Sequence, residues 1–179
     1  MSIAETYEAL ARLLEYPESS DTMLQSLWRI ACYLEECGLD CPALPFTAML
    51  TELTMGELQE EYVAQFDFNP AKAPYLAHHL YGNTQGKGAY MVKVKQTYDR
   101  FGYTPETKEL PDHLSVLLNF LAHLSRIGEE DERRQFIAET VLPGVAKLAG
   151  SGGGSEWPWL PVIKTTELLL RTDCRETTT

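Results

Sequence analysis

The stretch from Leu110 to Ile127, "LPDHLSVLLNFLAHLSRI", places two apolar stripes on one helical pattern. The first stripe consists of Leu114, Leu117, Leu121 and Leu124, and the second of Val116, Phe120 and Ile127. A helix that is apolar on two sides has to be covered by other elements on both of them. The stretch therefore predicts a central helix, with the rest of the chain packed around it.

Helical patterns also fill most of the remaining sequence. Ser2 with Glu5 and Thr54 with Glu57 have the spacing of capping boxes, and apolar residues at helical spacing follow each pair. The stop signals that end such patterns are Pro17, Gly38, Gly82 and Gly102. We expect a single all-α domain over residues 1–179, a helical bundle of about eight to nine helices.

Some local features carry more specific expectations. A second helix opens at Ser20 or Asp21, and its spacing predicts that its inward residues are Leu24, Trp28, Ala31 and Leu34. Pro143 interrupts a later helical pattern and predicts a kink or a restart. The glycine-rich residues 150–155 predict a flexible surface loop, and residues 175–179 predict a frayed tail.

The composition restricts the classes of function and the location. The formal net charge is −11, and a strongly acidic chain repels phosphates, so we expect no binding to nucleic acid. The acidic surface favours a basic partner. The N-terminal segment lacks the pattern of a secretory signal, and no window reaches the roughly 20 apolar residues of a membrane span. We expect a cytoplasmic protein without direct membrane insertion.

The residues that most often hold metals or nucleotides do not form a standard motif. The four cysteines, spaced as in no common zinc site, are Cys32, Cys37, Cys41 and Cys174, and we interpret them as free thiols in a reducing compartment. His78 and His79 are adjacent, so on a helix they point about 100° apart. The segment Gly82–Tyr90 departs from a phosphate-binding loop in both spacing and context. We therefore expect no metal and no cofactor.

Asp112 and His113, which stand at the start of the central helix, allow two interpretations. In the first, Asp112 is the N-cap and its carboxylate accepts the N–H of Leu114 or Ser115, while His113 bonds a neighbouring segment. In the second, the two side chains belong to a functional site. Capping explains Asp112 but not the neighbouring His113 or the preceding Glu109. No nucleophile lies in a recognisable catalytic context, and on local grounds both interpretations stay open.

Three motifs give the chain a resemblance to a known family. Glu109-Leu110-Pro111-Asp112-His113 resembles the Glu-x-Pro-x-Asp-His-type signature of the TorD/DmsD/NarJ superfamily of redox-enzyme maturation chaperones, with Pro and Asp adjacent as in its NarJ branch. Residues 62–68, "YVAQFDF", are similar to a Tyr-x-x-x-Phe-Asp segment of that family. The run from His79 through Gly82 to Gly88 is similar to its His-x-x-Gly segment, with Lys87 in place of the branch's Arg.

This resemblance implies a TorD-like helical fold and a function. The family's members are cytoplasmic chaperones that bind the N-terminal segment of a molybdenum oxidoreductase catalytic subunit and assist molybdenum cofactor insertion. They do so without catalysis, so the resemblance implies that this protein is not an enzyme. For the present chain the implied client is a respiratory nitrate reductase. The alternatives are a chaperone for another molybdoenzyme's twin-arginine signal peptide and a small helical nucleotide-binding enzyme. We expect a monomer or a weak homo-oligomer.

The resemblance also implies where the client peptide binds. Carried over onto this sequence, the motifs predict a set of peptide-binding residues consisting of Tyr62, Phe66, Asp67, Glu109, Pro111, Asp112 and His113. We expect the two segments to meet in space and to form one wall of a groove. In that wall, Asp67 and Asp112 would orient His113 or face a basic residue of the client.

Overall fold

The computed structural model describes residues 1–151 and 157–175, and within these ranges the chain is helical with no strand. The segments are α1 (Ile3–Leu13), α2 (Ser20–Glu36), α3 (Phe46–Glu52), α4 (Met55–Tyr62), η1 (Val63–Asp67), α5 (Leu76–Tyr81), α6 (Gln85–Arg100), α7 (Leu114–Arg126), α8 (Glu130–Phe136), η2 (Ile137–Val141), α9 (Leu142–Ser151) and α10 (Leu160–Arg175). Because α4 continues into η1, and α8 through η2 into α9, the described segments form nine continuous helices. This confirms the predicted all-α bundle.

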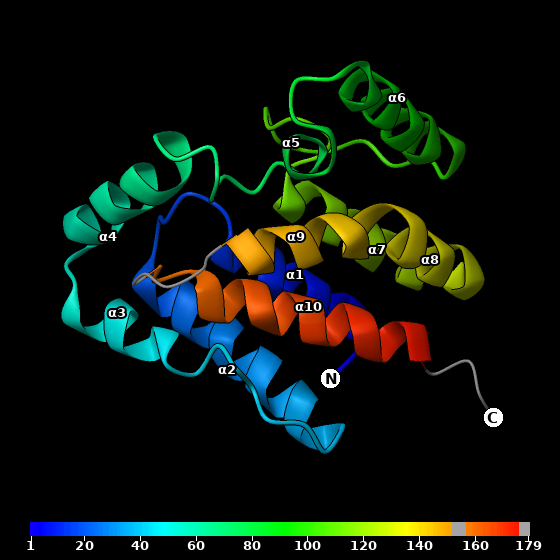
Figure 1. Cartoon of the computed structure of the whole chain (residues 1–179). Helices are drawn as coiled ribbons and strands as arrows, with labels where there is room; N and C mark the ends of the chain where they lie inside the picture. The colour runs from blue at the N-terminus through cyan, green and yellow to red at the C-terminus, as the bar shows by residue number, and fades with distance from the viewer. Residues whose placement is uncertain (152–156, 176–179) are drawn as a thin grey trace.

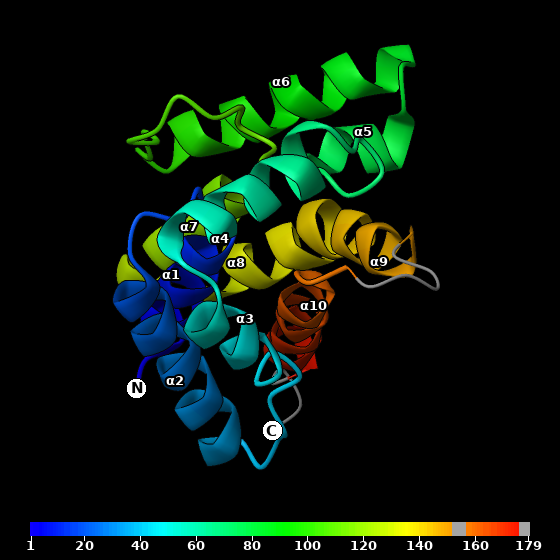
Figure 2. The ribbon, with the colours of Figure 1, turned by 90° about the vertical axis from the view of Figure 1, so that its left-hand side faces the viewer.

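The central position of α7 is confirmed by its burial on both stripes. All the predicted stripe residues are buried except Ile127, which is 47% exposed because it already belongs to the C-cap. Helix α7 packs most extensively against α1, and α1 packs in turn against α2. In both views α5 and α6 lie over one end of this core, and α2 lies at the other end (Figures 1 and 2). The apolar helix predicted to organise the fold therefore does so.

The predicted inward face of α2 is partly wrong. Trp28 is 57% exposed, and the row that faces the core consists of Met23, Leu27, Ile30 and Leu34. Those residues recur at the same helical spacing as the predicted row, so periodicity alone could not choose between two adjacent apolar rows. Leu24 and Ala31 pack at the margin of the core. The consequence is an indole side chain left on the surface.

Two π-helical segments interrupt the α-helices. In η1 the N–H of Phe68 donates to the carbonyl of Val63, which is five residues earlier. Segment η2 lies directly before Pro143, a residue that cannot donate the usual backbone hydrogen bond. The helix therefore passes Pro143 through a π-turn and continues as α9, which corresponds to the predicted restart.

The predicted flexible loop and tail lie mainly outside the described residues. Gly150 and Ser151 form the end of α9, where the Ser151 hydroxyl donates to the carbonyl of Leu148, so the loop does not begin at residue 150. Residues 152–155 lie outside the described part of the chain. Arg175 is the last residue of α10, and residues 176–179 lie outside it as well.

A buried ionic cluster joins α1, α8 and α10. Asp173 accepts hydrogen bonds from the Tyr7 hydroxyl (2.6 Å) and from two guanidinium nitrogens of Arg133 (2.8 Å each). Arg133 also pairs with Glu130. We call Tyr7, Glu130, Arg133 and Asp173 the closed cluster. Its hydrogen bonds connect residues up to 166 positions apart, so it fixes the last helix against the first.

Candidate functional site: an acidic pocket at the end of the first helix

Asp112 connects two segments of the core and is not the N-cap of α7. Its Oδ2 accepts the N–H of Ala77 (3.0 Å), and its carbonyl accepts the N–H of Leu76 (3.2 Å). The carbonyl of Pro74 accepts the N–H of Leu114 (2.8 Å). Asp112 is buried, and burial raises the pKa of its carboxyl group although the Ala77 N–H opposes this shift. The predicted cap on α7 is therefore wrong, because the carboxylate instead satisfies the first turn of α5.

His113 is the actual N-cap of α7. Its Nδ1 accepts the N–H of Ser115 (3.2 Å) and lies 2.8 Å from the Ser115 hydroxyl, while its ring packs edge-on against Tyr75 with centroids 5.0 Å apart. Burial lowers the pKa of His113 to about 4, although the nearby Glu109 carboxylate acts in the opposite direction. The imidazole is therefore neutral near pH 7. No contact joins it to Asp112 or Asp67, so neither carboxylate orients the ring as predicted.

Glu109 is exposed, in contrast to the two residues above. Its carboxylate accepts the Tyr75 hydroxyl (2.7 Å), and its backbone N–H donates to the Thr107 hydroxyl (3.2 Å). Burial raises the pKa of Tyr75, and the Glu109 carboxylate adds to this effect. Pro111 lies beside it, half-buried, with its carbonyl accepting the Tyr98 hydroxyl (2.7 Å). The motif thus places one exposed carboxylate, held by Tyr75, at the surface, while Pro111, Asp112 and His113 are half-buried or buried.

The second motif is mainly an aromatic core. Tyr62 packs against Phe66 (4.8 Å between centroids) and against Trp159 (5.7 Å), and Phe66 lies between Trp157 and Trp159. The Tyr62 hydroxyl donates to the carbonyl of Leu14 (3.0 Å) at the end of α1. Both aromatic residues are buried. The motif therefore packs the end of α4 onto the bundle.

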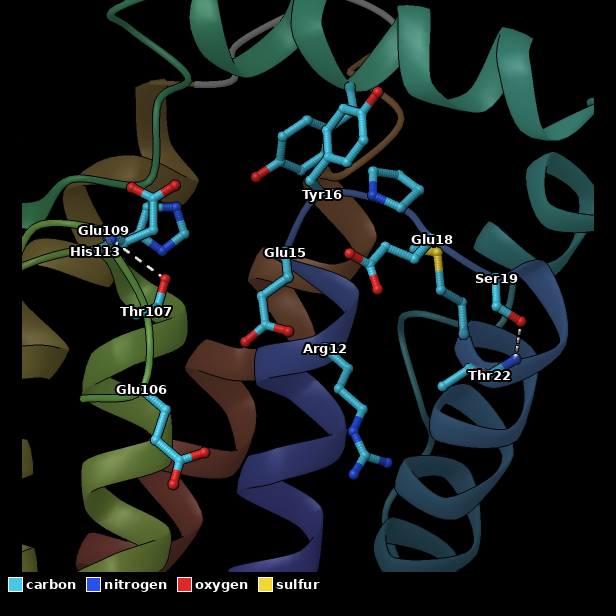
Figure 3. A pocket seen from close by; sticks show the side chains of 13 residues that line it. Arg12, Glu15, Tyr16, Glu18, Ser19, Thr22, Glu106, Thr107, Glu109 and His113 are labelled. Carbon is cyan, nitrogen blue, oxygen red and sulfur yellow. Dashed lines mark hydrogen bonds between the residues drawn. The ribbon is translucent and has the colours of Figure 1, made fainter. Parts of the chain in front are cut away.

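The two motifs meet at a pocket of about 510 Å³ beside the end of α1. Its lining consists of Arg12, Glu15, Tyr16, Pro17, Glu18, Ser19, Thr22, Met23, Tyr62, Glu106, Thr107, Glu109 and His113, and Figure 3 shows this pocket. We call it the acidic pocket. Three of the seven predicted residues, Tyr62, Glu109 and His113, line it. Phe66, Asp67, Pro111 and Asp112 do not.

The acidic pocket has an excess of carboxylates. Glu15, Glu18, Glu106 and Glu109 face one guanidinium, that of Arg12, and His113 adds no charge when neutral. Figure 3 shows the Glu15 side chain turned toward the segment that carries Glu106 and Glu109. Solvent reaches Glu15, but the surrounding walls desolvate it, and this burial raises the pKa of its carboxyl group. The charge of Arg12 and a hydrogen bond with Asn119 oppose the shift, and repulsion from Glu18 and Glu109 adds to it. The pocket is therefore suited to a cation.

Most of this pocket was not predicted from the sequence. The residues from Arg12 to Met23 come from α1, from the connection that follows it and from α2, about 90 positions before the Glu109 motif. In the sequence, Glu15 and Glu18 look like ordinary solvent-facing residues around Pro17. A cluster of glutamates beside a helix-ending proline was the one available signal.

The cysteines, the adjacent histidines and the glycine-containing segment were the other candidates for a site. None of the four cysteines forms a disulfide, and no group of three or more His, Cys, Asp or Glu within 1–151 and 157–175 is arranged to hold a metal ion. The rings of His78 and His79 are 5.7 Å apart at 78°, and His79 Nε2 lies 2.6 Å from the carbonyl of Ala73. Gly82 ends α5 with a positive φ, as expected for a helix-to-helix turn.

Within residues 1–151 and 157–175, none of the helices combines the length and the apolar character that crossing a bilayer requires.

The fold and the pocket define a class: a helical bundle that presents an acidic pocket assembled from its first helix and a loop before its central helix. The sequence model of the nitrate reductase delta subunit family matches residues 33–149. The chain belongs to this family.

Individual relatives agree with that assignment. The chain is 29% identical over 147 residues to a Bacillus subtilis protein named "Probable nitrate reductase molybdenum cofactor assembly chaperone NarJ", covering 80% of this chain and 76% of that protein. It is 30% identical over 124 residues to Escherichia coli NarJ, an assembly chaperone of the same name, covering 64% and 50%. The chain is 27% identical over 156 residues to E. coli NarW, covering 85% and 62%. The match therefore spans only half of E. coli NarJ.

A solved structure has the same fold. It is a crystal structure from Archaeoglobus fulgidus named as a candidate redox enzyme maturation protein, with a TM-score of 0.64, 18% sequence identity and coverage of 96% of this chain and 95% of that one. At this identity the likeness concerns the fold alone. The TorD-like bundle expected from the motifs is thereby confirmed.

Proposed function

We propose that this protein is an assembly chaperone that binds the N-terminal segment of a molybdenum oxidoreductase catalytic subunit, nitrate reductase, and assists molybdenum cofactor insertion. Membership of the nitrate reductase delta subunit family and the names of the NarJ and NarW relatives support this function. Those relatives are named chaperones, which supports a role without catalysis. The four cysteines form no disulfide, which agrees with work in the reducing cytoplasm.

The observation that carries the proposal is the excess of unpaired carboxylates in the acidic pocket. Neither Glu18 nor Glu106 makes an ion pair or hydrogen bond with another described residue, and Arg12 is the one cation on the pocket wall. A basic side chain of the client would be attracted into the space beside Glu15 and Glu109. Because His113 is neutral near pH 7, it does not repel that cation.

The buried part of the signature has a different task in this proposal. Asp112 fixes the chain from Pro74 to Ala77 against the start of α7, and this contact sets the position of Tyr75, which holds Glu109. Asp112 is thus a positioning residue, and Glu109 is the residue that meets the client. Phe66 and Asp67 lie outside the pocket, and Phe66 supports it through its contact with Tyr62.

A titration tests this function directly. The ligand is a synthetic peptide with the first few dozen residues of the nitrate reductase catalytic subunit from the same organism, and the readout is calorimetric affinity. We expect Glu109→Gln and Glu15→Gln each to weaken binding by about fivefold to tenfold at low salt, because each removes one attracting charge. We expect the wild-type affinity to fall as NaCl rises from about 0.05 M to about 0.5 M.

Asp131→Asn is the matched control, because this side chain is 99% exposed on α8 and does not line the pocket. It removes the same charge from the protein without changing the pocket. Equal affinities for Glu109→Gln, Glu15→Gln and wild type would contradict the assignment of the pocket. Absence of any binding by the wild-type protein to this peptide would contradict the proposed function.

A further inference from the structure

A second hollow lies beside the acidic pocket and differs from it in chemistry. It has a volume of about 400 Å³, and its lining consists of Tyr16, Gly56, Gln59, Glu60, Val63, Ala64 and Phe68. We call it the aromatic shelf. It contains one carboxylate, that of Glu60, whereas the acidic pocket contains four. No predicted peptide-binding residue belongs to it.

The local backbone explains how the aromatic shelf forms. Around η1, Tyr62 and Phe66 are buried in the core, while Val63, Ala64 and Phe68 lie on the outer side and line the shelf. The Phe68 side chain is 80% exposed, more than any other large apolar side chain among the described residues. π-helical turns are rare and are frequent at functional sites. An exposed phenylalanine in such a turn therefore needs an explanation beyond the stability of the fold.

Tyr16 makes the two hollows continuous. It lines both of them, it is 50% exposed, and its ring stands edge-on to Tyr62 with centroids 5.6 Å apart. In Figure 3, Tyr16 stands at the edge of the acidic pocket, between the end of α1 and the helix that passes above it. One bound segment can therefore contact both hollows across a single tyrosine ring.

We infer that the aromatic shelf binds an apolar side chain of the same client segment whose basic side chain occupies the acidic pocket. This inference rests on the proposed function and adds to it the chemistry of the ligand: a basic and an apolar residue presented on one face. The change from four carboxylates to one along the continuous surface matches such a segment. A second copy of this chain fits less well, because each copy carries a net charge of −11 and repels the other.

Phe68→Ala is the variant that tests the aromatic shelf. With the client peptide described above, we expect about tenfold weaker binding, because an exposed aromatic ring that becomes buried on binding is a typical hot spot. Trp28→Ala is the matched control: Trp28 is a comparably exposed aromatic residue on α2, and it lines neither hollow. We expect its affinity to equal that of the wild type.

A double-mutant cycle identifies the contact. Each apolar residue of the peptide is replaced by alanine in turn, and each peptide is titrated against wild type and Phe68→Ala. We expect one peptide position at which the effects of the peptide substitution and of Phe68→Ala on affinity are not additive. At that position, the loss of affinity caused by the peptide substitution should be several-fold smaller with Phe68→Ala than with wild type. Full additivity at every position would overturn the inference.

The remaining outcomes separate the inference from the proposed function. If Phe68→Ala binds like wild type while Glu109→Gln binds more weakly, the aromatic shelf is not part of the site and the proposed function stands. If the wild-type protein binds no client peptide, the inference and the proposed function are both overturned. If sedimentation shows a wild-type dimer that Phe68→Ala dissociates, with peptide affinity unchanged, the shelf is a self-association surface and the inference is overturned.

Discussion

The closed cluster and the acidic pocket use the same side-chain types in opposite ways. In the closed cluster, the Asp173 carboxylate meets a buried guanidinium and a phenol, and every partner comes from the protein itself. Burial alone would lower the pKa of Arg133, but the hydrogen bonds and charge of Asp173 raise it instead. In the acidic pocket, four carboxylates face one arginine, and Glu18 and Glu106 have no partner among the described residues.

This difference separates charges that stabilise the fold from charges that are available to another molecule. Burying an ion pair is costly, and the protein retains the closed cluster where three helices have to be held together. Exposed like charges contribute repulsion to the folded state, so their grouping around one pocket is not explained by stability. The comparison therefore indicates that substitutions in the closed cluster should affect folding, and that substitutions in the acidic pocket should affect binding.

The largest expected effect is that of Asp173→Ala on stability. Removing this carboxylate leaves Arg133 buried with only the partly exposed Glu130 as its partner, and we expect a loss of about 3 kcal/mol in the free energy of unfolding. Urea denaturation followed by circular dichroism measures it. Asp131→Ala, at a fully exposed carboxylate, is the control and should lie within about 0.5 kcal/mol of wild type. A loss no greater than that of the control would show that the closed cluster does not hold the fold.

An intermediate effect is expected at His113, which is buried in the wall of the acidic pocket. Its ordinary pKa of 6.5 falls to about 4 in the folded protein because the ring is buried. Between these values the unfolded state binds one more proton than the folded state, so stability falls as the pH falls. From pH 6.5 to 5 this residue should contribute a loss of about 1.5 kcal/mol in the free energy of unfolding.

The measurement compares the pH dependence of unfolding in wild type and in His113→Gln. Between pH 6.5 and 5, the free energy of unfolding should fall by about 1.5 kcal/mol less in the variant than in wild type. Burial also raises the pKa values of Asp112 and Glu15, and these groups act in the opposite direction, but both remain in the variant and cancel in the difference. Parallel curves for the two proteins would contradict a buried, neutral His113.

The smallest effect is expected for the unpaired carboxylates. Glu18→Gln and Glu106→Gln remove a negative charge that has no partner, and we expect the free energy of unfolding to change by no more than about 0.5 kcal/mol. The same denaturation assay checks this, and the double variant should be at least as stable as wild type because repulsion is reduced. A loss above 1 kcal/mol in either variant would remove the distinction between the two regions.

Much of the fold could be predicted from the sequence, because it depends on regular local signals. The capping boxes at Ser2 and at Thr54 form as expected, α2 begins at Ser20, and the stripes of α7 are buried as their spacing indicated. Each of these features depends on residues within a few turns of one another. The orientation of Trp28 was not predictable, because two adjacent apolar rows on α2 are equivalent without knowledge of where α1 lies.

The candidate site was less predictable, because it depends on contacts between distant segments. Choosing between Asp112 and His113 as the cap requires knowing that the Ala77 N–H lies 3.0 Å from the Asp112 carboxylate, a contact across 35 positions. The contribution of Glu15 depends on the packing of α1 beside α7. The outward direction of Phe68 follows from a π-turn, for which the sequence contains no clear signal. The motifs located one wall of the pocket and left the other wall unknown.

The contacts of Trp159 have a practical consequence for spectroscopy. This indole is buried against Tyr62, and Tyr62 lines the acidic pocket, so the emission of Trp159 is sensitive to changes at that wall. Trp28 is exposed to solvent and does not line the acidic pocket, so it should contribute a constant, red-shifted background emission. Replacing Trp28 by phenylalanine would leave an intrinsic fluorophore pair, Trp157 and Trp159, that reports occupancy of the pocket without any attached label.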